Sequence, residues 1–291
     1  MGPPVRLAPI EPAFAETATF LDTTLDALLP QPGGPESRLI EAMRYATMGN
    51  PHRLRAFLVL QSGRLFGVDR RALGRVAVAV ECLHASALIR DDLLPSEMPE
   101  QRQGRPPLQT AFDLATARLA ADTLLILAPG LLASAETHGD PFVRCDLVSK
   151  LSAAGGYTGM TGGEMIDMAI GSTQPGLQDL TRMARMKTAA LITYCCEAGA
   201  IMAKASNSAR QSLIAYGQEL GLACQIAADL SRNSSPNISA ATKHNVASLL
   251  GCDRATAQAE ALAAQAASHL DLFDEKADLL RAAATFVVSQ A

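Results

Sequence analysis

Residues 76–94 read VAVAVECLHASALIRDDLL, a run in which apolar or small side chains fill nearly every position before a closing pair of acids. A second run of the same kind, residues 213–230, reads LIAYGQELGLACQIAADL and also closes on an acid. Helices that are apolar on all sides belong in the middle of a large helical bundle. The two runs therefore predict two central helices, each with carboxylates at one end.

The rest of the chain repeats the helical pattern. No run of alternating β-branched residues bounded by turns occurs, which argues against a sheet. We expect an all-α fold with one domain over residues 12–291, preceded by an N-terminal tail over residues 1–11. The predicted helices span residues 12–29, 36–48, 51–65, 69–92, 109–135, 141–155, 159–170, 176–204, 207–231, 241–251 and 253–289.

Composition excludes several classes of protein. Of the 291 residues, 48% are hydrophobic and 19% charged, so the chain is not intrinsically disordered. A net charge of −4 without a basic block argues against a nucleic-acid partner. The N-terminus lacks the pattern of a signal peptide, and Pro129 and Glu197 interrupt the most apolar stretches, so no membrane span is expected.

The cysteines and histidines point to no metal centre. The six cysteines show no C-x-x-C spacing and lie in apolar helical patterns, which predicts buried, reduced thiols in a cytoplasmic protein. The five histidines are scattered, without a pair at helical spacing, so a zinc enzyme is not expected.

The acids at the ends of the two apolar runs are the candidate chemical groups. Asp91 and Asp92 close the first run, and Gln225 and Asp229 share one face of the second at i, i+4. Carboxylates at the mouth of an apolar cavity need a compensating cation, and hard oxygen ligands of this kind suit Mg²⁺. A helix cap or a solvated helix end is the structural alternative, and an isolated Asp-Asp pair favours it.

Six segments in order give these acids a context. Together they resemble the trans-prenyltransferases, the family of polyprenyl or isoprenyl diphosphate synthases, in which an aspartate-rich motif is followed by arginines and a Gly-Arg-Pro. The segments are residues 44–55, DDLLPSEMPEQRQG at 91–104, GMTGGEMID at 159–167, Lys187-Thr188, Gln225–Asp229, and Lys243 followed by 248–251.

The resemblance implies an all-α, isoprenoid-synthase-like bundle of about ten or more helices around a central cavity, usually in a homodimer. It implies the 1′-4 condensation of isopentenyl diphosphate with an allylic diphosphate, with Mg²⁺ as cofactor. The catalytic residues it implies are Asp91, Asp92, Lys187, Thr188 and Gln225. The substrate-binding residues are His52, Arg53, Arg55, His84, Arg102, Lys187 and Lys243. The metal residues are Asp91, Asp92, Glu97 and Asp229.

Departures from the family pattern leave three functions open. Gln103 replaces the second arginine of the first motif, and the second motif keeps only Asp229, with Ala228 and Arg232 in place of acids. An active prenyl diphosphate synthase with a weakened second motif is the first hypothesis. The second is a weak or inactive subunit that binds prenyl diphosphates or regulates an active partner. The third is a class I terpene cyclase-like enzyme.

Product length is expected from residues one turn before Asp91. In family members that make fifteen-carbon products, an aromatic residue four or five positions before the first acid commonly forms the cavity floor. Here those positions hold Ala87 and Ser86, which are both small. The resemblance therefore predicts a product of C20 or longer.

Overall fold

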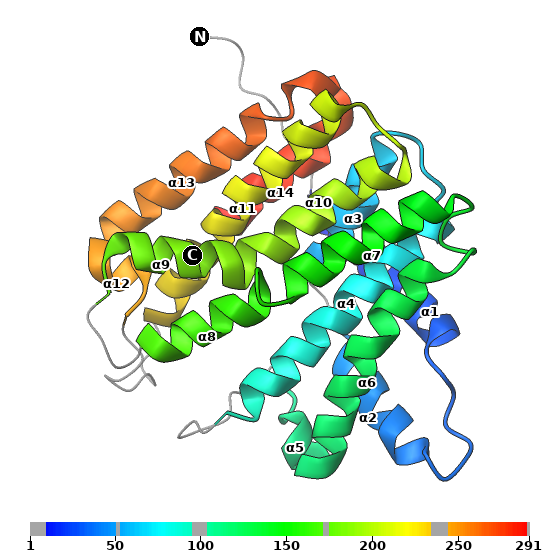
Figure 1. Ribbon diagram of the computed structural model, residues 1–291. Coiled ribbons are helices and arrows are strands. Elements are labelled where there is room, and N and C mark those ends of the chain that lie inside the picture. The colour runs from blue at the N-terminus through cyan, green and yellow to red at the C-terminus, as the bar shows by residue number, and fades with distance from the viewer. Residues whose placement is uncertain (1–9, 51–52, 95–103, 171–174, 234–243, 290–291) are drawn as a thin grey trace.

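The protein is a bundle of helices (Figure 1). The computed structural model describes residues 10–50, 53–94, 104–170, 175–233 and 244–289, and every regular element within these ranges is helical. The elements are α1 (Ile10–Leu28), α2 (Ser37–Thr47), α3 (Leu54–Arg64), α4 (Arg70–Asp92), α5 (Leu108–Ala111), α6 (Leu114–Ala133), α7 (Pro141–Gly155), α8 (Met160–Ile170), α9 (Leu177–Ala184), a π-helical turn (Arg185–Ala189), α10 (Ala190–Met202), α11 (Asn207–Asn233), α12 (Val246–Leu250), α13 (Cys252–Ser268), a 3₁₀ segment (Asp271–Ala277) and α14 (Asp278–Ser289). The predicted all-α fold is confirmed.

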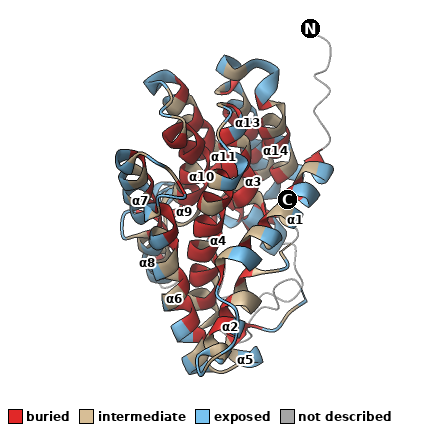
Figure 2. Cartoon of the chain, turned by 90° about the vertical axis from the view of Figure 1, so that its right-hand side faces the viewer, coloured by how far each residue is buried: buried red, intermediate tan, exposed pale blue. Residues whose placement is uncertain are grey.

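Helix α4 forms the centre of the bundle, as its sequence predicts. It packs between α3 and α6, and Figure 2 shows it buried along most of its length. Asp69 begins the helix by accepting a hydrogen bond from the backbone N–H of Ala72 at 2.9 Å, the usual role of an aspartate at an N-cap. At the other end the Gln109 amide donates to the backbone carbonyl of Asp92 at 2.6 Å, which fixes the end of the helix that carries the two acids.

Glycines let α10 approach its neighbours closely. A Cβ on Gly199 would lie 2.3 Å from the backbone nitrogen of Gly63 in α3, and one on Gly221 of α11 would lie 2.4 Å from Ala189 Cα. No side chain fits at either position, so α3, the α10 region and α11 pack backbone to backbone. This close packing fixes the relative position of the π-helical turn and α11, which carry the second group of candidate residues.

The C-terminal ends of α4 and α11 carry the candidate acids. In Figure 1 both ends point toward the lower left, the side on which α8 also lies. Asp91 and Asp92 close α4, and Gln225 and Asp229 lie in the last turns of α11.

Three predicted helices are interrupted. Residues 109–135 divide into α5 and α6 because Asp113 accepts a hydrogen bond from Thr116 N at 2.7 Å and so caps a new helix. Residues 176–204 contain the π-helical turn, and residues 253–289 contain the 3₁₀ segment. The first break depends on a capping side chain, whereas the other two leave no glycine or proline signal in the sequence.

Two sequence expectations about surface and burial were wrong in part. Cys145 and Cys252 are exposed, although the six cysteines form no disulfide. Helix α6 runs through Pro129, which was expected to interrupt it. By length and composition alone, α4 and α6 are each long and apolar enough to cross a membrane. The apolar stretch of α4 is 78% buried in the protein, as a core helix should be, whereas that of α6 is only 33% buried.

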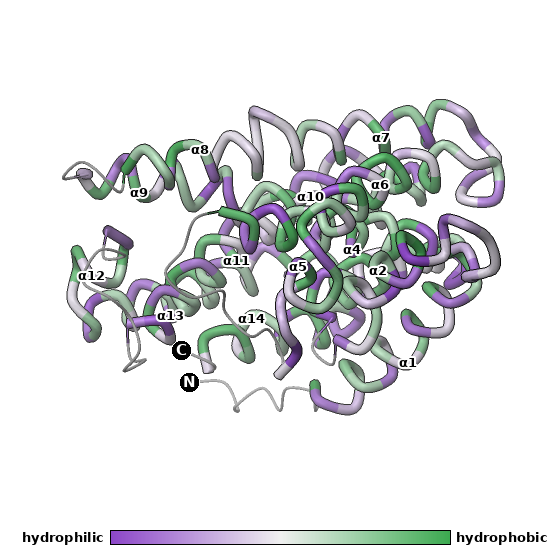
Figure 3. The backbone as a smooth tube through the Cα atoms, turned by 90° about the horizontal axis from the view of Figure 1, so that it is seen from below, coloured by the Kyte–Doolittle hydropathy of each residue, from purple (hydrophilic) through white to green (hydrophobic). Residues whose placement is uncertain are grey.

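Apolar residues also lie on the outside of the bundle. In Figure 3 the tube of α8 is hydrophobic over much of its length, although Met165 and Met168 on that helix are exposed. Leu119 and Ile126 on α6 are 57% and 72% exposed, and Phe142 at the start of α7 is 83% exposed.

Candidate active site

A basic cavity lies between the α2–α3 connection, α4 and the segment before α5. Its volume is about 390 Å³. It brings together Arg53, Arg55 and His84, the three described residues to which the resemblance assigned isopentenyl diphosphate. The lining residues are Tyr45, Ala46, Thr47, Met48, Asn50, Arg53, Arg55, Glu81, His84, Ala85, Leu88, Ile89, Asp92, Arg105, Pro106, Pro107 and Leu108.

Arg53 is held inside the wall of this basic cavity. Its side chain is 1% exposed, and its two Nη atoms donate to Glu81 Oε2 at 2.9 Å and Asp22 Oδ1 at 2.6 Å. Nη2 also donates to the Thr47 carbonyl at 2.7 Å. The backbone of Arg53 is in the left-handed region, at φ 32°, a conformation that costs a non-glycine residue about 1–2 kcal/mol. These contacts favour a structural role for Arg53 over the predicted contact with substrate.

Three other basic residues reach the basic cavity. Arg55 and His84 line it from α3 and α4, and both are partly exposed. Arg105 lines it from the segment before α5, where its guanidinium lies 3.9 Å from the centre of the Tyr45 ring. Its Nη1 also donates to the Met48 carbonyl at 3.0 Å. Sequence comparison assigned no role to Arg105.

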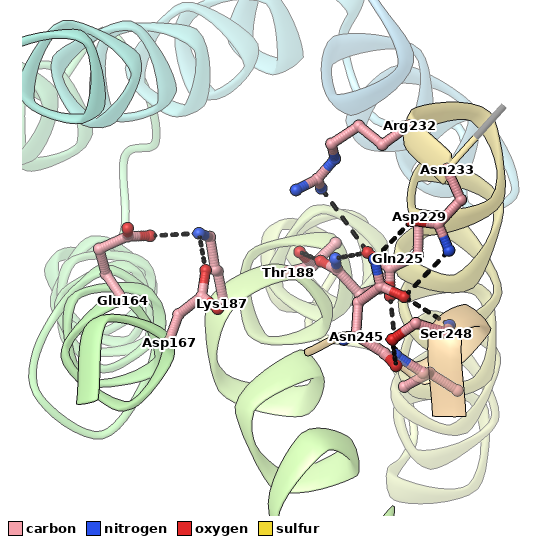
Figure 4. A network of polar contacts seen from close by, with 11 residues as sticks. Glu164, Asp167, Lys187, Thr188, Gln225, Asp229, Arg232, Asn233, Asn245 and Ser248 are labelled. Atoms are coloured by element: carbon pink, nitrogen blue, oxygen red, sulfur yellow. Dashed lines mark hydrogen bonds and ion pairs between the residues drawn. The ribbon is translucent and has the colours of Figure 1, made fainter. Parts of the chain in front are cut away.

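A second set of polar residues, which we call the α8–α11 cluster, contains Lys187. Figure 4 shows its ammonium between two carboxylates of α8, with Nζ 2.7 Å from Glu164 Oε2 and 2.6 Å from Asp167 Oδ2. Burial by itself would lower the pKa of Lys187, but the two carboxylates outweigh it and raise that pKa. Lys187 therefore stays charged at neutral pH. In the family pattern that residues 159–167 resemble, the position of Glu164 holds a glutamine, so Lys187 meets one more negative charge than that pattern implies.

The other half of the α8–α11 cluster is a chain of hydrogen bonds. The Thr188 hydroxyl donates to Gln225 Oε1, and Gln225 Nε2 donates to Asp229 Oδ1 at 2.8 Å (Figure 4). The backbone N–H of Val246, at the start of α12, donates to Asp229 Oδ2 at 3.3 Å. The chain orients the Thr188 oxygen and the Gln225 amide toward defined partners.

Asp229 is buried at the end of this chain. Its side chain is 1% exposed, and Arg232 Nη2 approaches its Oδ1 at 3.7 Å. Burial raises the pKa of Asp229, against the opposing effects of Gln225, Arg232 and the Val246 N–H. Both oxygens of Asp229 therefore accept hydrogen bonds from the protein, and its role as a metal ligand stays a prediction.

Asp91 and Asp92 are the described residues among the predicted magnesium ligands. Both are partly exposed at the end of α4, and Asp92 lines the basic cavity. Within the described ranges, no three His, Cys, Asp or Glu side chains gather in a way that could hold a metal. Mg²⁺ is commonly bound by one or two carboxylates together with waters and substrate phosphates, so a two-acid site is sufficient.

Four predicted site residues fall outside the residues that the structure describes. These are His52, Glu97, Arg102 and Lys243. The two predicted chain-length residues are described: Ser86 is fully buried and Ala87 is 7% exposed on α4. The Ser86 hydroxyl is buried without a hydrogen-bond partner among the described residues.

Comparison with known proteins agrees with this arrangement. The family profile described as polyprenyl synthetase matches residues 36–238. The chain belongs to the polyprenyl synthetase family. The match includes the basic cavity, both aspartates of α4 and the residues of α8 and α11 that surround Lys187.

Individual relatives are similar over most of the chain. The farnesyl diphosphate synthase of Escherichia coli K12 is 36% identical over 199 residues, which cover 66% of this chain and 65% of that enzyme. The geranylgeranyl diphosphate synthase of Pantoea ananas is 33% identical over 213 residues, 72% of this chain and 70% of that enzyme. The crystal structure of an FPP/GFPP synthase from Zymomonas mobilis has a TM-score of 0.89 and 40% identity, and covers 96% of this chain and 98% of that one.

Proposed function

We propose that this member of the polyprenyl synthetase family condenses isopentenyl diphosphate with an allylic diphosphate to make a trans-prenyl diphosphate. The observation that carries the proposal is the basic cavity, where Arg55 and His84 gather beside Asp92. A cavity of about 390 Å³ with basic walls and an apolar side formed by Leu88 and Ile89 suits a short apolar chain that carries a diphosphate. The names of the relatives support the same reaction class.

In the proposed reaction the allylic carbon–oxygen bond breaks, pyrophosphate leaves, and the double bond of isopentenyl diphosphate attacks the cation before a proton is lost. Thr188 directs its hydrogen to Gln225, so its oxygen lone pairs are available to face the positive carbon. Asp229 holds Gln225 in place from the other side. The apolar side chains of α4 exclude water, which would otherwise quench the cation.

Lys187 would bind a phosphate oxygen of the allylic substrate after exchanging one of its two carboxylate partners. Asp91 and Asp92 would hold Mg²⁺, with Glu97 as a further candidate outside the described residues. When bound, the metal supplies charge neutralisation that helps pyrophosphate leave. Arg102, His52 and Lys243, which also lie outside those residues, remain proposed phosphate contacts.

We favour a product of C20 or longer because no large side chain stands at positions 86 and 87 of α4. Both side chains are buried, and the Ser86 hydroxyl has no hydrogen-bond partner among the described residues. A growing prenyl tail would therefore meet only small side chains at these two positions.

The alternative is a weakly active or inactive subunit that binds prenyl diphosphates. The hydrogen bonds that Gln225 and Val246 donate to Asp229 favour it, because the second motif then offers no free carboxylate among its three acid positions.

A terpene cyclase-like enzyme is the second alternative. Incubation with labelled isopentenyl diphosphate and each of three allylic diphosphates separates them. Elongated product supports the synthase, binding without turnover supports the subunit, and a hydrocarbon supports the cyclase.

The metal proposal has its own test. Pyrophosphate should raise the melting temperature of the wild type only with Mg²⁺ present, because a ligand that binds only the folded state stabilises it. The Asp91→Ala, Asp92→Ala variant should lose that increase. If the double variant keeps it, the metal is bound by other residues.

We also infer a homodimer, with α6 and α7 at its interface, and a cytoplasmic location for a chain without disulfides. The exposed Leu119 and Ile126 on α6 and Phe142 on α7 support this interface, because α6 packs against α7 and large apolar side chains on such a face are stabilised by burial against a partner. Light scattering after gel filtration should give twice the 30.6 kDa mass of the chain. An Ile126→Glu variant should shift that mass toward the monomer.

A further inference from the structure

The positive charge of the basic cavity is smaller than its sequence suggests. Arg53 faces two carboxylates, Glu81 and Asp22, at hydrogen-bond distance, so this trio adds no net positive charge to the wall. In the sequence, a neutral Gln103 stands where the family pattern has the second arginine of the first motif, so this chain has one cation fewer than that pattern. A diphosphate carries several negative charges and is bound tightly by guanidinium groups that can each donate two hydrogen bonds. The basic cavity therefore needs a cation from another position.

Arg105 supplies a guanidinium at the required place. It follows Gln103 by two residues and lines the basic cavity, as Arg55 and His84 do. No acid in the described ranges forms an ion pair with it, in contrast to Arg53. Among the residues that the structure describes, Arg105 donates one hydrogen bond, to the Met48 carbonyl at 3.0 Å, although a guanidinium has five N–H donors. The remaining donors are available to a bound anion.

The guanidinium of Arg105 is also held in position before any ligand arrives. Its planar group lies 3.9 Å from the centre of the Tyr45 ring, and the Tyr45 hydroxyl donates to the Pro106 carbonyl at 3.0 Å, beside Arg105 in the chain. Gly104 precedes it at φ 72°, a conformation that glycine adopts readily and that turns the chain toward the α2–α3 connection. A stacked, hydrogen-bonded arginine loses less side-chain freedom when it binds a ligand than an exposed one would.

We propose that Arg105 is a diphosphate-binding residue of the isopentenyl diphosphate pocket and replaces the cation that Gln103 lacks. This rests on the proposed function, and it assigns part of that substrate's affinity to the arginine of the Gly-Arg-Pro that follows the first motif, a residue to which the resemblance gave no role. The role requires both the positive charge and the planar donor group, since the stacking on Tyr45 fixes the plane of the guanidinium.

The test measures binding of isopentenyl diphosphate by titration calorimetry without metal or allylic substrate. Arg105→Gln should weaken binding about tenfold or more, and Arg105→Lys should fall between that variant and the wild type. The control is Arg38→Gln, because Arg38 also stacks on an aromatic ring, Phe112, but pairs with Asp113 and is not among the residues that line the basic cavity. Arg38→Gln should change the affinity less than about twofold.

A second measurement distinguishes a contact of Arg105 with the diphosphate from a structural role, in which its hydrogen bond to the Met48 carbonyl holds the chain after α2. Wild type should prefer isopentenyl diphosphate to isopentenyl monophosphate, and Arg105→Gln should lose most of that preference. In turnover, the variant should raise the KM for isopentenyl diphosphate and leave the KM for the allylic substrate unchanged. If wild type binds isopentenyl diphosphate and both Arg105 variants bind it as well as wild type with the same preference, the inference is overturned. If the wild type itself does not bind isopentenyl diphosphate, the proposed function fails instead.

Discussion

The buried contact between Arg53 and Glu81 gives the sharpest stability prediction. Glu81→Leu removes the carboxylate that meets Arg53 Nη1 at 2.9 Å and leaves the guanidinium, 1% exposed, with Asp22 as its remaining charged partner. Removing one partner of a buried ion pair commonly costs about 3–5 kcal/mol. Asp22 and the Thr47 carbonyl still accept hydrogen bonds from Arg53, so we expect a loss near the lower limit, about 3 kcal/mol.

The loss of stability converts into a measurable change in melting temperature. A chain of 291 residues unfolds with an entropy of about 0.6 kcal/mol per kelvin at its midpoint, so 3 kcal/mol lowers the melting temperature by about 5 °C. Calorimetry or circular dichroism at fixed protein concentration measures it. Asp22→Asn is the matched control, because the Asp22 side chain is 37% exposed and its pairing contributes about 1 kcal/mol or less.

A double variant tests the reasoning itself. Arg53→Met with Glu81→Leu removes both buried charges, so it should be less destabilised than Glu81→Leu alone. If the double variant is the less stable of the two, or if Glu81→Leu melts within about 1 °C of wild type, the buried charge of Arg53 is not what Glu81 compensates.

Three smaller tests address the rest of the site. Ser86→Phe or Ala87→Phe should shorten the product, because a ring at either buried position would overlap a growing tail in a close-packed interior, and chromatography of dephosphorylated products would reveal an unchanged length. Ala228→Asp with Arg232→Asp should raise turnover in saturating Mg²⁺, since position 228 is exposed beside Asp229; an unchanged rate with intact circular dichroism would count against weak metal binding as the defect. Burial raises the pKa of Asp229 above its ordinary 3.8, so the folded state binds its proton more tightly and stability falls as pH rises through that range. Relative to wild type, Asp229→Asn should therefore gain melting temperature as the pH rises above about 4, and a difference that does not change with pH would contradict this.

The sequence predicted those parts of the site that depend on one helix or on one short segment. The apolar run before Asp91 fixes a central helix and the place of its acids, because a helix without a polar face has no stable position at the surface. Arg55 and His84, to which the resemblance gave a role in substrate binding, both line the basic cavity, and the binding itself stays a prediction. Gln225 and Asp229 contact each other because residues four apart share a helix face.

What the sequence missed depends on partners from distant segments. Arg53 is withdrawn into the wall by Glu81, 28 positions later, and by Asp22 in α1, and no local pattern connects the three. Lys187 is enclosed by Glu164 and Asp167, which only the packing of α8 against the π-helical turn brings close. Arg105 belongs to the Gly-Arg-Pro of the family pattern, but the motif alone assigns it no role, because its contacts with Tyr45 and Met48 come from a distant segment. Such contacts are set by tertiary packing, which a single sequence does not display.

The π-helical turn at Arg185–Ala189 makes the site depend on chain length as well as on composition. A π turn contains one residue more than an α turn, and here it carries Lys187 and Thr188. A Cβ on Gly163 of α8 would lie 2.3 Å from the Lys187 backbone nitrogen, so the wide turn packs against α8 only because residue 163 has no side chain. Deleting one residue of the turn would rotate Lys187 and Thr188 away from Gln225 by roughly the 100° that one helical residue spans. A glycine opposite a widened turn is thus a geometric signature of this half of the site, and it can be sought in chains whose aspartate motifs have decayed beyond recognition.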